Sequence, residues 1–388
     1  MSLSTWPHYD EDEIQAVQAV LRSGKVNYWT GDEGRQFEKE FAALVGAAYG
    51  VAMMNGTVTL EAALKVLDVG AGDEVIIPCH SFAATATAVV AVGAIPVFAD
   101  VELDSNNVSA ETIKAAISPQ TKAIIVVHIA GLPCDMDPIL ALAKSHDLKV
   151  IEDCAQAHGA FYKGRAVGSM GDIGSFSFCQ DKIITTGGEG GMVVTQSEAL
   201  WKKLWAYKDH GKAYDAVYHK EHAPGFRWVV ESFGSNLRMT EMQAAIGRLQ
   251  IKKLPAWHKT RTENADLLRT AFDGISALRI PPVPSDVVPA NYKFYCYVRP
   301  EKLKADWDRD RISDEINARG IKCLVGGCAE IYREKAFAEA GFLPEKRLPN
   351  AKVLSETTLM LLIDPSISKA SMDKMASAVT EIMQAASA

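Results

Sequence analysis

Hydrophobic residues in the first two-thirds of the chain fall into short continuous runs that alternate with helical patterns. Four helical patterns have apolar positions spaced for one buried face, over 59–67, 83–92, 110–117 and 138–146. Seven runs have the length and composition of buried strands, over 51–54, 74–77, 95–98, 123–127, 150–152, 174–178 and 191–195. This alternation predicts an α/β fold with a mainly parallel seven-stranded sheet that is flanked by helices.

Two further helices are predicted ahead of the first strand, over 10–22 and 36–45. Asp10 can cap the first of them, Glu13 follows three residues later, and Gly24 can end it. After about residue 254 the pattern changes to a polar helix (257–271), a proline-rich segment (281–289), and then strands and helices (294–299, 307–319, 321–325 and 369–385). We therefore predict an N-terminal segment with a large domain over 1–254, and a small C-terminal α/β domain over 255–388.

Composition excludes several classes of protein. The 388 residues are 48% hydrophobic and 23% charged, which is typical of a globular chain and not of a disordered one. The net charge is −7, and no run of basic residues is present, so we expect no nucleic-acid partner. Seven cysteines, an odd number without CxxC spacing, favour reduced thiols in the cytoplasm over disulfides or a zinc site.

An uncharged stretch over 75–99 is long enough to span a membrane. Pro78, Gly93 and Pro96 interrupt it, so a buried strand, helix and strand is the better interpretation. The first residues have neither a basic start nor an apolar core, and we expect no signal peptide and no membrane partner.

Asp153 stands directly after the strand predicted over 150–152, in the segment VIEDCAQAHGA. Ligands of open parallel sheets bind beyond the carboxyl ends of the strands, so this carboxylate can face a ligand. Gln156 follows three residues later and can address the same ligand. A helix cap or a loop ion pair is the alternative for Asp153. His158 can also line the cleft, and a packed histidine is the alternative for it.

Lys182 leaves a half-buried strand directly into a glycine-rich loop, in the segment GSFSFCQDKIITTGGEGG. A lysine that is held in a cleft can form a Schiff base, and the glycines let the backbone approach a ligand closely. A solvated surface lysine is the alternative. The GGEGG run is not a GxGxxG fingerprint and precedes a strand, which argues against a dinucleotide site.

The segment NGTVTLEAAL contains a strand end, a Gly-Thr pair and a helix start. Amides at a helix N-terminus attract phosphate, and the Thr57 hydroxyl adds a donor; an ordinary helix cap is the alternative. No GxxxxGK[ST] pattern is present, so a nucleotide P-loop is not supported. A phosphate cradle, a carboxylate and a Schiff-base lysine on one sheet together suit pyridoxal 5'-phosphate.

With these segments, the chain resembles the DegT/DnrJ/EryC1/StrS aminotransferases, the sugar-nucleotide branch of the fold-type I pyridoxal phosphate enzymes. The resemblance runs from SGKVNYWTGDEGRQFEKEFA to the C-terminal helix. It rests on six blocks in the family's order: NGTVTLEAAL, GDEVIIPCHSFAATATAV, GAIPVFADV, VIEDCAQAHGA, FSFCQDKIITTGGEGGM and GSNLRMTEMQAAIGRLQ.

The resemblance implies a role for each matching position. Lys182 would hold the cofactor covalently and move protons once released, and Asp153 would pair with the protonated pyridine nitrogen. Asn236 would reach the phosphate of the neighbouring subunit, which makes a homodimer with shared active sites the expected unit. The remaining implied contacts are with the ring hydroxyl (Gln156), the ring face (Phe82, otherwise a core aromatic) and the phosphate (Gly56, Thr57, Ser177 and the amide of Val58). Arg238 and His210 would approach substrate or, alternatively, form a loop ion pair.

The implied reaction moves an amino group from L-glutamate, or L-glutamine, to a keto sugar on a nucleotide diphosphate. Carbon 4 of the sugar is the expected position, and the products would serve polysaccharides such as lipopolysaccharide. Family members that dehydrate sugars carry histidine at the position of Lys182, so the lysine favours transamination. No metal is expected in the site. A nucleotide-free keto-cyclitol or keto sugar phosphate is the alternative acceptor, and a non-catalytic regulator is a third hypothesis.

Three segments depart from the family's pattern. Cys179-Gln180-Asp181 stands where relatives commonly have a histidine and a threonine, Asp364-Pro365 stands for His-Pro, and GGCAEIYREKAF replaces a His-Tyr segment. Asp181 would favour a protonated amine on Lys182 if the two lie close together. These segments border the sugar and the nucleotide in relatives, so the identity of the substrate stays open while the cofactor site is intact.

Overall fold

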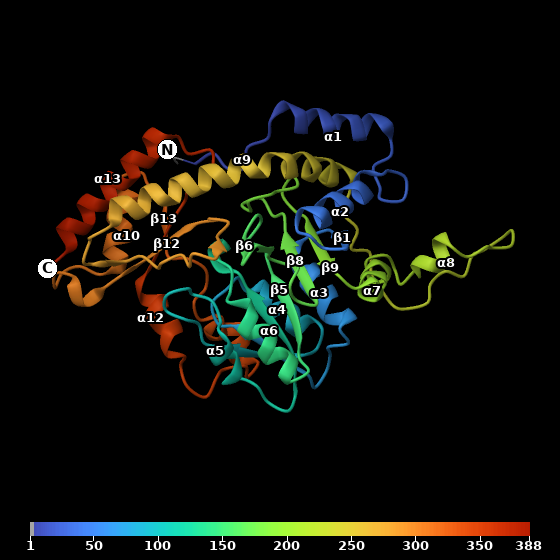
Figure 1. Ribbon diagram of the computed structural model, residues 1–388, viewed down its shortest axis with the longest axis horizontal. Coiled ribbons are helices and arrows are strands. Elements are labelled where there is room, and N and C mark those ends of the chain that lie inside the picture. Colours follow the sequence, from blue (N-terminus) through green and yellow to red (C-terminus); the bar gives the residue numbers. More distant parts are fainter. Residues whose placement is uncertain (1–3) are drawn as a thin grey trace.

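A seven-stranded sheet forms the centre of the protein, which a computed structural model describes over residues 4–388 (Figure 1). Only β9 runs against its neighbours, pairing antiparallel with β1 and β8, while the other adjacent pairs are parallel. The predicted mainly parallel sheet is confirmed. Its strands, in spatial order, are β1 (Tyr49–Met53), β9 (Gly191–Thr195), β8 (Ile173–Ser177), β5 (Lys149–Asp153), β4 (Thr121–Val127), β2 (Glu74–Pro78) and β3 (Ile95–Ala99).

The sheet is buried on both faces, as its apolar strands predict. Alternate residues of β9 show this: Val193 joins one hydrophobic core, while Met192 and Val194 join another. The covering helices are α2 (Glu33–Leu44), α3 (Gly56–Val66), α4 (Ala84–Ala91), α6 (Met136–Ser145) and α7 (Glu198–Lys208), while α1 (Glu11–Ser23) and α5 (Ala110–Lys114) pack against other helices. As predicted, Asp10 and Glu13 form a capping box on α1, and Gly24 ends it in a left-handed conformation.

A single long helix, α9 (Glu241–Phe272), connects the large sheet to the C-terminal part (Figure 1). The predicted start of a helix at residue 257 is therefore wrong, because that helix is only the second half of α9. Pro255 lies inside it without ending it. Packing on both sides of the proline stabilises the helix, with α1 and α2 contacting α9 as well as the C-terminal helix α13 (Lys369–Ala386). The predicted domain division near residue 254 falls within α9 and stays a prediction.

The C-terminal part is built on a four-stranded antiparallel sheet with its own hydrophobic core, drawn from residues between 265 and 386. In spatial order its strands are β10 (Leu278–Arg279), β12 (Phe294–Val298), β14 (Thr358–Leu361) and β13 (Cys323–Leu324). The predicted strands at 294–299 and 321–325 are present, whereas β14 was not predicted. Helices α10 (Arg309–Ala318), α11 (Lys335–Glu339) and α12 (Pro349–Thr357) complete this part.

Two further features lie outside the two main sheets. A small sheet joins sequence-distant segments, since β11 (Val287–Val288) pairs with β6 (Phe161–Tyr162), which pairs with β7 (Arg165–Ala166). The short helix α8 (Tyr214–Tyr218) opens an arm that projects away from the rest of the chain (Figure 1). No helix within residues 4–388 combines the length and the apolarity that a membrane span requires.

Candidate active site

The carboxyl ends of the parallel strands place the predicted site residues along one edge of the sheet. Gly56 follows β1, Phe82 follows β2, Asp153 ends β5, and Ser177 ends β8. Lys182 lies in the loop after β8. The chain therefore brings a phosphate-binding segment, a carboxylate and an amine to one edge, as the rule for open α/β sheets predicts.

Asp153 is a buried carboxylate. Its Oδ2 accepts a hydrogen bond from the Thr85 hydroxyl at 3.0 Å, and its Oδ1 accepts one from the Ala155 amide at 3.1 Å. Burial raises the pKa of Asp153, and these two donors together with the charge of Lys182 only partly oppose the rise. Among the described residues, no ion pair includes Asp153, so a protonated ring nitrogen would supply the missing positive partner.

Lys182 is not a solvated surface lysine, since its side chain is only 15% exposed. Its Nζ lies 3.5 Å from the Tyr292 hydroxyl and 3.6 Å from Oδ1 of Asp181. Tyr292 in turn donates a hydrogen bond to Oδ2 of Asp181. The backbone carbonyl of Lys182 accepts a hydrogen bond from the Trp6 indole at 2.9 Å, and this contact fixes the backbone of the loop. Asp181 is thus close enough to act on the amine, as the sequence suggests.

The candidate phosphate cradle is formed where α3 meets the end of β8. A Cβ atom on Gly56 would lie 2.5 Å from Cβ of Ser177, so only glycine permits this approach. The amides of Thr57 and Val58 both donate to Oδ1 of Asn55, at 3.0 Å each. Asn55 therefore caps α3, as the alternative of an ordinary helix cap proposes. A bound phosphate would have to share the two amides with the Asn55 side chain.

Gln156 and Phe82 follow β5 and β2 at the same edge of the sheet. Oε1 of Gln156 accepts a hydrogen bond from the Ala130 amide at 2.7 Å, which fixes the side chain through its oxygen. Phe82 is 71% exposed, so the alternative of a core aromatic is wrong.

His158 is a packed histidine, as the alternative interpretation proposed. It is buried against the rings of Phe41, Phe176 and Phe178. Burial lowers the pKa of His158 to about 3, so the ring is neutral at neutral pH.

Asn236 and Arg238 lie beside the end of β1, on the segment that follows the projecting arm. Arg238 forms an ion pair with Asp209, with 2.8 Å between Nη1 and Oδ1, so the loop ion pair is the interpretation that holds for Arg238. Asn236 is exposed, as is His210. Within this chain, the backbone of Asn236 bridges to Asp209.

The match to a known family covers almost the whole chain. The model of the DegT/DnrJ/EryC1/StrS aminotransferase family matches residues 7–380. The chain belongs to this family. It is a pyridoxal phosphate-dependent aminotransferase with the fold of the fold-type I enzymes.

Two relatives and a solved structure show how close the match is. The aminotransferase is 37% identical over 385 residues to the spore coat polysaccharide biosynthesis protein SpsC of Bacillus subtilis (strain 168), covering 98% of this chain and 96% of that protein. It is 38% identical over 349 residues to the UDP-N-acetyl-3-dehydro-alpha-D-glucosamine 3-aminotransferase of Acidithiobacillus ferrooxidans, covering 90% and 88%. The X-ray structure of the aminotransferase from Psychrobacter cryohalolentis shares 51% identity, covers 99% of each chain and superposes with a TM-score of 0.97.

The residues present fit pyridoxal 5'-phosphate. Gly56 approaches Ser177 so closely that a side chain would fill the cradle, and buried Asp153 calls for a positive partner. Lys182 is free to bond to the cofactor because its contacts, Tyr292 and Asp181, are hydrogen-bonding groups and not a fully buried ion pair. When bound, the cofactor draws electrons from the substrate's reacting carbon. These residues would hold and orient the cofactor, and Lys182 Nζ would move the protons.

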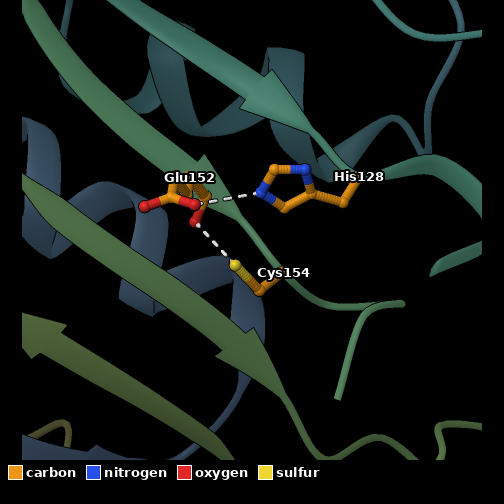
Figure 2. Close-up of side chains that lie close together, drawn as sticks. All are labelled: His128, Glu152 and Cys154. Atoms are coloured by element: carbon orange, nitrogen blue, oxygen red, sulfur yellow. Dashed lines mark hydrogen bonds and ion pairs between the residues drawn. The ribbon is translucent and has the colours of Figure 1, made fainter. Parts of the chain in front are cut away.

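A buried cluster consists of His128, Glu152 and Cys154, and the last two flank Asp153 in the sequence (Figure 2). Within the described residues its ligand atoms are already engaged. His128 Nε2 lies 3.1 Å from Glu152 Oε2, and its Nδ1 accepts a hydrogen bond from the Cys134 amide at 3.0 Å. Glu152 also accepts three amide hydrogen bonds, at 2.7 to 2.8 Å, from residues 168, 170 and 171. The aminotransferase uses this cluster to fix the end of β5 that carries Asp153.

Tyr292 is the site residue that the sequence did not indicate. It lies in the loop before β12, 110 positions from Lys182, and its amide donates to the Ala130 carbonyl at 3.0 Å. No local motif marks it, because its place depends on the packing of the C-terminal part against the loop after β4. The only signal in the sequence is its partner, the unusual Asp181.

Proposed function

We propose that this aminotransferase moves an amino group from L-glutamate, or L-glutamine, to a keto sugar that is carried on a nucleotide diphosphate. The observation that carries the proposal is Lys182, an amine at the carboxyl edge of the sheet on the same side as buried Asp153. The names of the two relatives support a sugar acceptor, since one acts on a UDP-linked 3-keto amino sugar and the other serves a spore coat polysaccharide.

The sugar carbon that receives the amino group is carbon 3 in our proposal. The relative from Acidithiobacillus ferrooxidans is named for a 3-dehydro substrate and a 3-amino product, and it shares 38% identity with this chain. Carbon 4, which the sequence analysis favours, stays a prediction and is the second candidate. A nucleotide-free keto-cyclitol or keto sugar phosphate remains the alternative acceptor.

We also infer a homodimer in which Asn236 completes the partner's site. The arm before Asn236 exposes large apolar side chains, with Phe233 fully exposed and Phe226 and Trp228 largely so. Exposed aromatic patches of this size mark contact surfaces. Since Asn236 directly follows this arm and is exposed in the single chain, a second copy docked on the arm would receive its side chain.

A panel of acceptors tests the proposed reaction. The purified holoenzyme is incubated with L-glutamate or L-glutamine and with UDP-linked 3-keto and 4-keto amino sugars, a keto sugar phosphate or a keto-cyclitol. The amino product is measured by mass spectrometry, with Lys182→Ala as the blank. We expect product from the UDP-linked 3-keto sugar. Preference for the 4-keto sugar would overturn the position, and preference for a nucleotide-free acceptor would overturn the substrate class.

A further inference from the structure

Lys182, Tyr292 and Asp181 form a continuous line of polar contacts that runs from a buried amine toward solvent. The Lys182 side chain is 15% exposed and the Asp181 side chain is 51% exposed, while Tyr292 between them is buried. The Tyr292 hydroxyl contacts both, at 3.5 Å from Lys182 Nζ and through its hydrogen bond to Asp181 Oδ2. The Lys182 amine is therefore connected to a water-accessible carboxylate through one phenol, in addition to the direct contact of 3.6 Å between Lys182 Nζ and Asp181 Oδ1.

The direction of each hydrogen bond follows from the groups present. A phenol has one proton to donate, and Tyr292 gives it to Asp181. Only lone pairs of its oxygen remain for Lys182, so the amine is the donor in the 3.5 Å contact. Proton donors and acceptors thus point the same way along the whole line, from Lys182 to Tyr292 to Asp181.

The charges along the line favour release of a proton from Asp181 to water, after the proton has arrived there. The Lys182 charge and the Tyr292 hydrogen bond outweigh burial and lower the pKa of Asp181, so its carboxylate does not retain a proton at neutral pH. Burial and the Asp181 charge raise the pKa of Tyr292, so the phenol stays neutral. Two more cations face Tyr292: Lys293 Nζ lies 4.6 Å from its ring centroid, and Arg261 donates to its carbonyl at 3.1 Å. Their charges oppose a second proton on the Tyr292 oxygen, so the phenol proton must leave as the new proton arrives.

We propose that Tyr292 and Asp181 are the proton path between the Lys182 amine and solvent. Lys182, once released from the cofactor, collects a proton from the amino donor's reacting carbon. The ammonium passes one proton to the Tyr292 oxygen while the phenol proton moves to Asp181, and Asp181 releases it to water. The net change is one proton transferred from Lys182 to solvent, with Tyr292 neutral and Asp181 ionised before and after, and the same steps in reverse return a solvent proton to the amine. Tyr292 is then a catalytic residue, and Asp181 accepts the proton from it.

Hydrogen exchange in the amino-donor half-reaction tests the path without any sugar, and it rests only on the donor part of the proposed function. The holoenzyme is incubated in D2O with L-glutamate or L-glutamine, and deuterium at the α-carbon of the recovered amino acid is divided by the keto acid formed. Tyr292→Phe and Asp181→Asn are compared with Tyr295→Phe, a matched control on β12 whose hydroxyl contacts the Gly327 amide. We expect the ratio to fall by about tenfold or more in the two path variants and to be unchanged in the control.

A second readout uses the cofactor-free protein. Acetylation of Lys182 is measured by mass spectrometry relative to Lys335, which is 86% exposed. We expect Lys182 to be acetylated several-fold faster in Tyr292→Phe and in Asp181→Asn, because each substitution removes a contact that holds the Lys182 amine.

The outcomes separate the path from the proposed donor. A ratio equal to that of the parent in both path variants would overturn the path, as would a fall in only one of them, because the path needs both residues. A fall in Asp181→Asn alone would assign the transfer to the direct contact between Lys182 and Asp181. A parent enzyme that converts neither amino acid would contradict the proposed donor instead.

Discussion

The hydroxyl of Thr85 donates a hydrogen bond to Asp153, with 3.0 Å between Thr85 Oγ1 and Asp153 Oδ2. Thr85 lies at the start of α4, three residues after Phe82, whereas Asp153 ends β5. This contact therefore fixes the position of Phe82, which is expected to stack on the cofactor ring, relative to Asp153, which is expected to pair with the ring nitrogen. Cofactor binding and the protonation of Asp153 are coupled through the same buried carboxylate.

Asp153→Asn should stabilise the cofactor-free protein at alkaline pH and weaken cofactor binding. Burial raises the pKa of Asp153 above its value in the unfolded chain, so ionisation of the carboxyl costs stability as pH rises through the folded value. The neutral amide avoids that cost. We expect a gain of about 1 kcal/mol at about pH 8 and none at about pH 3, where both states are protonated. Thermal melts across this range measure it, with and without pyridoxal phosphate.

The opposite pattern would contradict this account of Asp153. A cofactor-free Asp153→Asn protein that melts below the parent at about pH 8, with an unchanged cofactor affinity, would show that the carboxylate is a structural group.

Gly56→Ala should destabilise the cradle, since its Cβ would lie 2.5 Å from Cβ of Ser177. We expect a loss of about 2 kcal/mol in the free energy of unfolding and a lower affinity for the cofactor. Gly70→Ala is the matched control, because the nearest atom to its Cβ is the Val92 carbonyl oxygen at 3.9 Å. The double variant Gly56→Ala/Ser177→Gly should recover part of the loss. A Gly56→Ala protein as stable as the parent would refute the close approach.

Glu152→Gln should unfold more easily, by about 3 kcal/mol, because the new amide cannot accept all the hydrogen bonds that Glu152 accepts. Burial alone would raise the pKa of Glu152, but His128 and the backbone amides lower it. Its contribution is therefore present above the ordinary carboxyl pKa and is lost as pH falls through the lowered value. Chemical denaturation at several pH values checks this, and the substitution should cost nothing at the acidic end.

The same cluster should not respond to metals. Since His128 uses both ring nitrogens, neither a chelator nor added zinc should shift the melting temperature of the parent. A shift with zinc that Glu152→Gln abolishes would show that the cluster binds metal after all.

Shared active sites predict that two inactive variants restore each other. Lys182→Ala and Asn236→Ala homodimers should each be inactive or strongly impaired. After the two are unfolded together and refolded, mixed dimers contain one site with both Lys182 and Asn236, and activity should reappear. Phe233→Asp should abolish this rescue, since Phe233 is fully exposed on the arm. Absence of rescue, with mixed dimers demonstrated by mass spectrometry, would place Asn236 in its own subunit's site.

Much of the fold follows from the sequence because its strands are buried on both faces. Continuous apolar runs mark such strands clearly, and all seven of the large sheet are found where they are predicted. The carboxyl-edge rule then places Asp153 and Lys182 without further information. The short strand β14 lacks this clarity, since it directly follows α12 and its apolar run continues the helix pattern.

Other features depend on contacts that no local pattern records. Pro255 reads as a helix break, yet packing on both sides keeps α9 continuous. The sequence analysis does not single out Asn55, yet this residue caps α3 by accepting from two amides. Tyr292 reads as one aromatic among several near β12, and only the packing of distant segments brings it to Lys182.

The most direct test of the account is the site at which the cofactor is bonded. The holoenzyme is reduced with borohydride, digested, and analysed by mass spectrometry, with Lys182→Ala as the control. We expect the pyridoxyl group on Lys182 alone, and none on the variant, which should still bind the amine form of the cofactor. A pyridoxyl group on another residue of the parent, or turnover by Lys182→Ala near the parent rate, would contradict the account.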